Sequence, residues 1–178
     1  MKNQKFEIVG TQSNIDWVGR KVTGAHNGTI AIKRGELLLS DGKLAGGKII
    51  VDTTSVKILD ITDPATNAQF AGHLASDDFF SSEKYPEAVL EIVSLNGSHV
   101  HGNLTIKGIT HPVGFDAVVK TDGNLLTATG RLVIDRTKYE MKFRSGNFFQ
   151  NLGDTLIYDH FELDVIVTAK TANEAVLA

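Results

Sequence analysis

The stretch His99–Val119, HVHGNLTIKGITHPVGFDAVV, decides the fold. Small or apolar residues occupy alternate positions of its first half: Val100, Gly102, Leu104 and Ile106. A second alternating run follows the pair Lys107-Gly108. Alternation of this kind is typical of half-buried strands, and a two-residue turn that contains glycine joins two strands into a hairpin. The expected register pairs Gly102 with Val113, Val100 with Phe115 and Leu104 with His111, so both apolar faces coincide.

Further strand candidates lie on both sides of this hairpin. Those before it are residues 5–9, residues 13–20, one run that holds both Ile30 and Ile32, one that holds Leu37 and Leu39, and one that holds Ile49 and Val51. Those beside and after it are residues 88–95, 125–134 and 161–168. Together these segments predict an all-β chain of about eight antiparallel strands with short turns. An up-and-down barrel removes the exposed edges of such a meander, and a sandwich is the alternative.

One segment of the chain has helical character. Asp63-Pro64 is a typical helix start, and Phe70 and Leu74 then share one helical face. The next stretch, SDDFFSSEKYPE, is a polar loop with three aromatic residues. The two together form either a lid over one end of the sheet or a crossover that plugs the core. We expect residues 1–170 to form a single domain and residues 171–178 to fray.

Composition narrows the class of protein. The chain has 178 residues, 42% of them hydrophobic, a net charge of −3 and no cysteine. This composition predicts a sizeable core, no disulfide or thiolate metal site, and no nucleic-acid partner. No apolar stretch reaches the ~18 residues of a membrane span, and the N-terminus MKNQKFEIVG lacks a signal-like run. We therefore expect a cytoplasmic protein as written, and a periplasmic one if the chain is a processed form.

Catalytic motifs are absent from the sequence, which contains no HExxH, GxSxG, GxGxxG or glycine-rich phosphate loop. The register puts His99 and His101 on the solvent side, so neither metal nor cofactor is expected. His111 falls on the apolar face, where it either touches a ligand headgroup or reaches water at the end of the barrel. Arg136 and Arg144 either bind an anionic headgroup, which suits a guanidinium, or form salt bridges.

Three blocks of the sequence resemble the YceI-like polyisoprenoid-binding family. They are GHLASDDFFSSEKYP at residues 72–86, HGNLTIKGITHPV at 101–113 and LVIDRTKYEMKF at 132–143. The opening SNIDWVGRKVTGAHNG is similar to the first strands of the family. The resemblance implies an eight-stranded lipocalin-like barrel whose long apolar tunnel binds an isoprenoid or similar lipid. It also makes a homodimer plausible.

The leading functional hypothesis is therefore non-catalytic binding, transport or storage of a long apolar amphiphile, such as a polyisoprenoid, quinone or fatty-acid-like molecule. The predicted pocket consists of Ile15, Trp17, Ile49, Val51, Leu90, Ile92, Val100, Leu104, His111, Val113, Phe115, Leu132, Arg136, Phe161 and Leu163. A gate over it is predicted from Phe70, Leu74, Phe79 and Phe80. Two alternatives are an enzyme that uses His111 or His26 on a small apolar substrate, and a barrel filled by its own side chains that acts through its surface.

Overall fold

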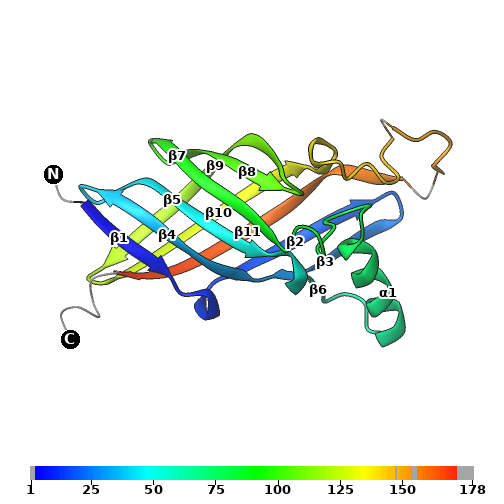
Figure 1. Ribbon diagram of the computed structural model, residues 1–178, viewed down its shortest axis with the longest axis horizontal. Helices are drawn as coiled ribbons and strands as arrows, with labels where there is room; N and C mark the ends of the chain where they lie inside the picture. The colour runs from blue at the N-terminus through cyan, green and yellow to red at the C-terminus, as the bar shows by residue number, and fades with distance from the viewer. Residues whose placement is uncertain (1–2, 147, 154–155, 172–178) are drawn as a thin grey trace.

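The computed structural model describes residues 3–146, 148–153 and 156–171. Eight of its strands close into an antiparallel barrel because the first strand pairs with both the fourth and the last (Figure 1). In spatial order they are β1 (Asn3–Ile8), β4 (Ile32–Ser40), β5 (Lys43–Asp52), β7 (Glu87–Asn96), β8 (His99–Ile106), β9 (Ile109–Asp122), β10 (Leu125–Asp135) and β11 (Ile157–Thr171). The predicted eight-stranded barrel is confirmed, and the sandwich is not formed.

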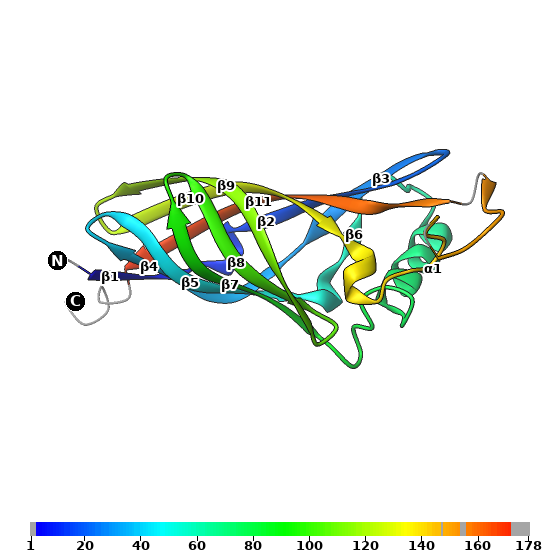
Figure 2. The same cartoon turned by 90° about the horizontal axis from the view of Figure 1, so that it is seen from above.

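Three additional strands extend the wall at one end of the barrel. They are β2 (Asn14–Lys21), β3 (Gly24–Ile30) and the short β6 (Lys57–Ile58). The extension depends on the 15-residue strand β11. The C-terminal part of β11 pairs with β1, and its earlier part pairs with β2. The wall is therefore longer at the end where β2 and β3 project (Figure 2).

The prediction that Ile30 and Ile32 share one strand is wrong. Ile30 ends β3 and Ile32 begins β4. The residue between them, Ala31, bonds instead to the end of β5 and to η2: its carbonyl accepts from the amide of Asp52, and its amide donates to Ser55 Oγ. These bonds replace the regular ladder, so the chain passes from the wall extension into the barrel at this point.

The β8–β9 hairpin has the predicted register. Val100 pairs with Phe115, Gly102 with Val113, and Leu104 with His111. Lys107 and Gly108 form the turn, with φ of 55° and 72° respectively. Two successive positive φ values match the right-handed twist of the strands, and glycine adopts them without steric cost.

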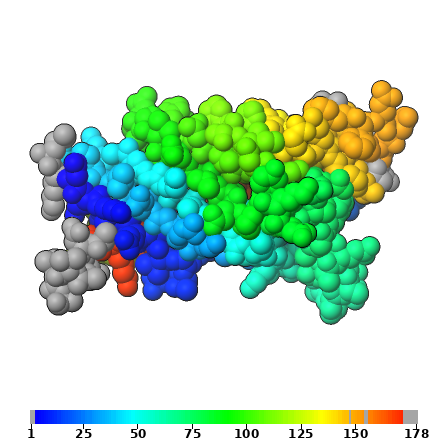
Figure 3. Space-filling model, in the orientation of Figure 1, coloured from blue at the N-terminus to red at the C-terminus, as the bar shows by residue number. Residues whose placement is uncertain are grey.

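The predicted helix is also present, as α1 (Pro64–Ala75), and the side chain of Asp63 caps it by accepting from the amide of Thr66. The helix and the loop that follows it lie at the end of the molecule where β2 and β3 project (Figures 1 and 2). None of the side chains of α1 is fully buried. The space-filling view shows α1 projecting beside the barrel wall (Figure 3). The remaining short elements are the 3-10 turns η1 (Gly10–Gln12), η2 (Thr53–Ser55) and η3 (Arg136–Tyr139).

Candidate functional site

A cavity of about 310 Å³ lies at the end of the barrel that carries α1. Its walls come from β2, β3, β5, β7, β8, β11, α1, the residues around η2 and the loops that follow α1 and β10. Eleven of the predicted site residues line it: Ile15, Trp17, Val51, Phe70, Leu74, Phe79, Phe80, Leu104, Arg136, Phe161 and Leu163. All four predicted gate residues are in this set, so α1 and the aromatic loop cover the cavity rather than only crossing the core.

The remaining eight predicted residues do not line the cavity. Five of them are buried in the core: Ile49, Leu90, Ile92, Val100 and Leu132. Val113 and Phe115 are partly buried and pack against the same core. Their neighbours in the half of the barrel away from α1, such as Leu126 and Ala169, have no exposed surface. The cavity lining thus comes from the half of the barrel near α1, and these eight residues are not part of it.

His111, the eighth, has the predicted position opposite Leu104 but a different environment. Its Nε2 lies 2.9 Å from the carbonyl oxygen of Lys138, and its ring meets that of Tyr139 edge-on at 5.3 Å between centroids. The imidazole thus contacts the η3 turn outside the cavity. His111 is not among the residues that line the cavity, although Leu104 opposite it is.

Arg136 lines the cavity, but its guanidinium is engaged by the main chain. Nε and Nη2 donate to the carbonyls of Tyr158 and Ile157, each at 3.0 Å, and Nη1 donates to the carbonyl of Met141. Only 3% of the residue is exposed. Burial lowers the pKa of Arg136, an effect partly offset by nearby carboxylates. Arg136 therefore joins the loop after η3 to the start of β11 and forms part of the cavity wall.

Three histidines that were not in the predicted pocket list also line the cavity: His26, His73 and His160. His26 lies 2.7 Å from Asp60 and edge-on to Phe70 of α1, with 4.9 Å between ring centroids. His73 contacts the rings of Phe79 and Phe143 at 5.1 Å and 4.7 Å. His26 thus connects α1 to β3, and His73 connects α1 to the loops around the cavity.

The loops at this end are joined by Lys107 in the β8–β9 turn. Its Nζ donates to the carbonyl of Asp77 at 2.7 Å and to that of Glu140 at 3.2 Å. Burial lowers the pKa of Lys107, against the opposing effect of the nearby carboxylates. One ammonium group thereby holds together the aromatic loop and the loop after η3, which supply Phe79 and Met141 to the cavity.

Sequence reasoning missed several apolar lining residues, notably Ile30, Ala88, Met141, Phe143 and Ile157. Met141 and Phe143 belong to an irregular stretch with no strand period. No local pattern could have assigned them to the cavity.

The mouth of the cavity is marked by residues that both line it and are exposed. Four residues both line the cavity and are exposed: Arg20, Arg144, Tyr158 and His160. Lys21 also lines the cavity, whereas no Asp or Glu of the described residues does. The site therefore combines a mainly apolar interior with cationic side chains around its opening.

Together these features define a class: a closed eight-stranded antiparallel barrel with an apolar cavity at one end. The chain belongs to the YceI-like domain family, whose model matches residues 6–169. No helix in the described part of the chain is long and apolar enough to cross a membrane.

Sequence relatives include a UPF0312 protein of Staphylococcus epidermidis, 35% identical over 105 residues, which covers 53% of this chain. A UPF0312 protein of Pseudomonas putida is 30% identical over 125 residues, or 67% of this chain. The matches span 61% and 62% of the length of these curated relatives.

Two solved structures share the fold over more than nine tenths of this chain. BcnA of Burkholderia cenocepacia superposes with a TM-score of 0.70 at 21% identity, covering 92% of this chain and 99% of BcnA. A polyisoprenoid binding domain from Saccharophagus degradans, described as implicated in plant cell wall breakdown, gives a TM-score of 0.65 at 14% identity, covering 93% and 98%. At these identities the likeness establishes the fold.

Proposed function

We propose that the protein binds a long apolar amphiphile, a polyisoprenoid or similar lipid, with its tail in the cavity under α1, and that it does so as a carrier or store rather than as an enzyme. The observation that carries the proposal is the apolar cavity itself, walled by strands and covered by Phe70, Leu74, Phe79 and Phe80. Family membership supports it, because one structural relative is described as a polyisoprenoid binding domain.

The size of the cavity limits the length of tail that fits. A volume of about 310 Å³ lies at the lower end of the range for small-molecule pockets. Each buried methylene contributes about 0.8 kcal/mol, so ten contribute about 8 kcal/mol before the costs of association are subtracted. Apolar burial alone is enough for binding, and polar groups need only orient the molecule.

The arrangement of charge gives the ligand a direction. The cavity lies at the α1 end of the barrel, where Lys21, Arg144 and Arg20, which pairs with Glu162 at 3.0 Å, line it. In the proposed complex the tail enters first and the polar headgroup stays at the mouth. A tail longer than the cavity extends outward past α1.

Trp17 provides a direct test, because it is the only tryptophan of the chain and lines the cavity. A fatty acid or polyprenol with bromine on its tail should quench the fluorescence of Trp17 in a saturable way. Replacing Val51 by Phe narrows the cavity and should weaken quenching, whereas Val93→Phe on the exposed outer face of β7 should not. Absence of saturable quenching in the folded wild-type protein would overturn the proposal.

The enzyme alternative now depends on His26, which lines the cavity and has Asp60 at 2.7 Å, an arrangement that could orient a general base. The same pair also has a structural use, since Asp60 accepts from the amide of Asn27 and His26 contacts Phe70. A catalytic and a structural role of His26 are separated by screening small esters and isoprenoid alcohols for turnover, with His26→Gln as the comparison. Turnover that is lost in His26→Gln while Trp17 quenching persists would favour the enzyme.

A further inference from the structure

Exposed aromatic side chains gather at one end of the molecule. Four aromatic residues in the described part of the chain are strongly exposed: Tyr85, Phe148, Phe149 and Tyr158, at 39%, 53%, 44% and 48%. All four belong to the loops and strand ends around the cavity. Tyr85 packs on the β8–β9 turn at Gly108. The hairpin turns at the opposite end, Asp41-Gly42, Gly97-Ser98 and Gly123-Asn124, carry no aromatic residue.

These rings are connected to the mouth through residues of the cavity lining. Phe149 contacts Phe143, with 6.4 Å between ring centroids, and Tyr158 itself lines the cavity. Val22, 46% exposed at the tip of the β2–β3 hairpin, is joined to the same region because its amide donates to the carbonyl of Leu156. We call Val22, Phe148, Phe149 and Tyr158 the apolar rim.

Positive charge accompanies the apolar rim. The Arg144 guanidinium lies 4.8 Å from the centre of the Phe143 ring. Lys142 Nζ lies 4.6 Å from that of Phe148 and also pairs with Glu140 at 3.3 Å. Within the part of the chain that the structure describes, neither Lys21 nor Arg144 has an ion-pair partner. The rim therefore carries local positive charge although the whole chain has a net charge of −3.

We propose that the apolar rim docks on the surface of an anionic lipid bilayer, with Lys21 and Arg144 at the level of the headgroups and the cavity mouth facing the membrane. Aromatic side chains favour the boundary between headgroups and acyl chains, and anionic lipids attract adjacent cations. A bilayer explains the combination better than an acidic protein does, because the apolar rim lies beside the opening of an apolar cavity. This inference rests on the proposed function. A lipid exchanged between the bilayer and the cavity through the docked mouth would not pass through water.

Flotation with vesicles tests the docking directly. The wild-type protein should float with vesicles of phosphatidylcholine and phosphatidylglycerol, and much less with pure phosphatidylcholine or in high salt. The pair Phe148→Ser with Phe149→Ser should weaken binding by about tenfold or more. The pair Lys21→Gln with Arg144→Gln should weaken it by about 25-fold, at about fivefold for each cation.

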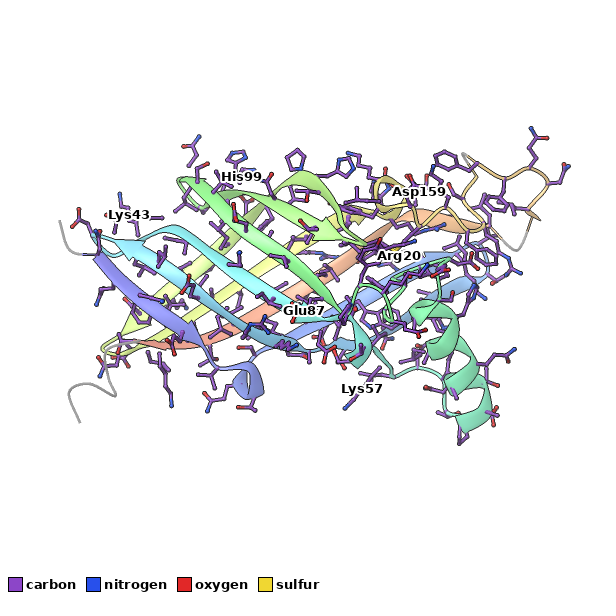
Figure 4. The ribbon with its side chains drawn as sticks, in the orientation of Figure 1. Arg20, Lys43, Lys57, Glu87, His99 and Asp159 are labelled. Atoms are coloured by element: carbon purple, nitrogen blue, oxygen red, sulfur yellow. The ribbon has the colours of Figure 1, made fainter. Side chains whose placement is uncertain are left out.

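Matched controls lie elsewhere on the barrel. Val118→Ser with Val133→Ser removes exposed apolar side chains from the outer wall, and Lys43→Gln removes a cation from the opposite end, where Figure 4 shows Lys43 far from Arg20. Both controls should float like the wild type. Equal losses in rim and control variants, or binding that ignores phosphatidylglycerol, would overturn the proposal.

A readout without vesicles separates this inference from the proposed function. Quenching of Trp17 by a soluble brominated fatty acid reports the cavity alone. The Phe148→Ser, Phe149→Ser variant should keep that quenching, because neither ring lines the cavity. A wild-type protein that is quenched but does not float would refute docking and leave lipid binding intact. A wild-type protein that floats but is not quenched would refute lipid binding in the cavity and leave docking intact.

Discussion

Trp17 and Gly28 face each other on β2 and β3, and the indole ring occupies the space that a side chain at Gly28 would need. A Cβ at Gly28 would lie 2.7 Å from Cζ2 of Trp17 and would overlap the carbonyl oxygen of Lys57. The indole Nε1 donates to the carbonyl of Thr29 at 3.3 Å, which fixes the ring in the cavity wall. The glycine thus determines where the largest lining side chain sits.

Gly28→Ala should destabilise the protein and displace the indole. Overpacking costs typically about 1–3 kcal/mol, and the carbonyl of Lys57 is backbone that cannot move aside cheaply. We expect a lower midpoint of urea unfolding and a shifted Trp17 emission. Gly72→Ala in α1 is the control, because a Cβ there meets nothing within 4 Å. Unchanged emission and stability in Gly28→Ala would contradict the packing described.

Replacing Arg136 by Met should cost about 3 kcal/mol of unfolding free energy, because the carbonyls of Tyr158, Met141 and Ile157 lose their donors in a buried place. Urea unfolding followed by circular dichroism measures the loss. Arg144→Met, at an exposed position, should change stability by much less. Similar small effects in both variants would show that Arg136 is not the structural clamp inferred from its contacts.

Tyr139 should make the protein sensitive to strong alkali. Burial, with the charge of Asp135, raises the pKa of Tyr139 from 10.0 to about 12. The folded protein then holds a proton that the unfolded chain releases above pH ~10, so this contribution to stability is complete below that pH and is lost as the pH rises through about 12. The phenolate absorbance of the wild type minus that of Tyr139→Phe should show the late titration. A difference that titrates near pH ~10 would contradict it.

Asp60 should contribute stability that disappears in acid. Burial raises the pKa of its carboxyl, but hydrogen bonds from the Asn27 amide and the His26 ring outweigh burial, so the pKa lies below its usual value. The contribution is therefore present above the ordinary carboxyl pKa and is lost as the pH falls through the lower folded value. The difference in unfolding free energy between the wild type and Asp60→Asn should shrink in that window. A difference that does not vary with pH would refute the assignment.

The β8–β9 hairpin and α1 could be predicted from sequence because their signals are local. Lys107-Gly108 and the alternation around it fix the register, and Asp63-Pro64 marks the start of the helix. The break at Ala31 could not be predicted, since the groups that stop the strand there, Asp52 and Ser55, are remote in sequence.

The cavity was harder to predict than the fold. Val100 and Leu104 have the same alternation on the same strand, yet only Leu104 lines the cavity. The difference is depth along the barrel, which depends on how facing side chains fill the interior. Period-two alternation reports which face points inward and contains no information about depth. For the same reason, Met141 and Phe143, which come from an irregular loop, escaped prediction.

The seam between β1 and β11 also bears on how the protein is made. Phe6 pairs with Thr171, so the two edges that close the barrel are separated by nearly the whole chain. Pairings of such large sequence separation form slowly. During synthesis the edge of β1 that faces β11 stays unpaired until β11 has been made. In this interval the nascent chain is most exposed to mispairing and to binding by chaperones.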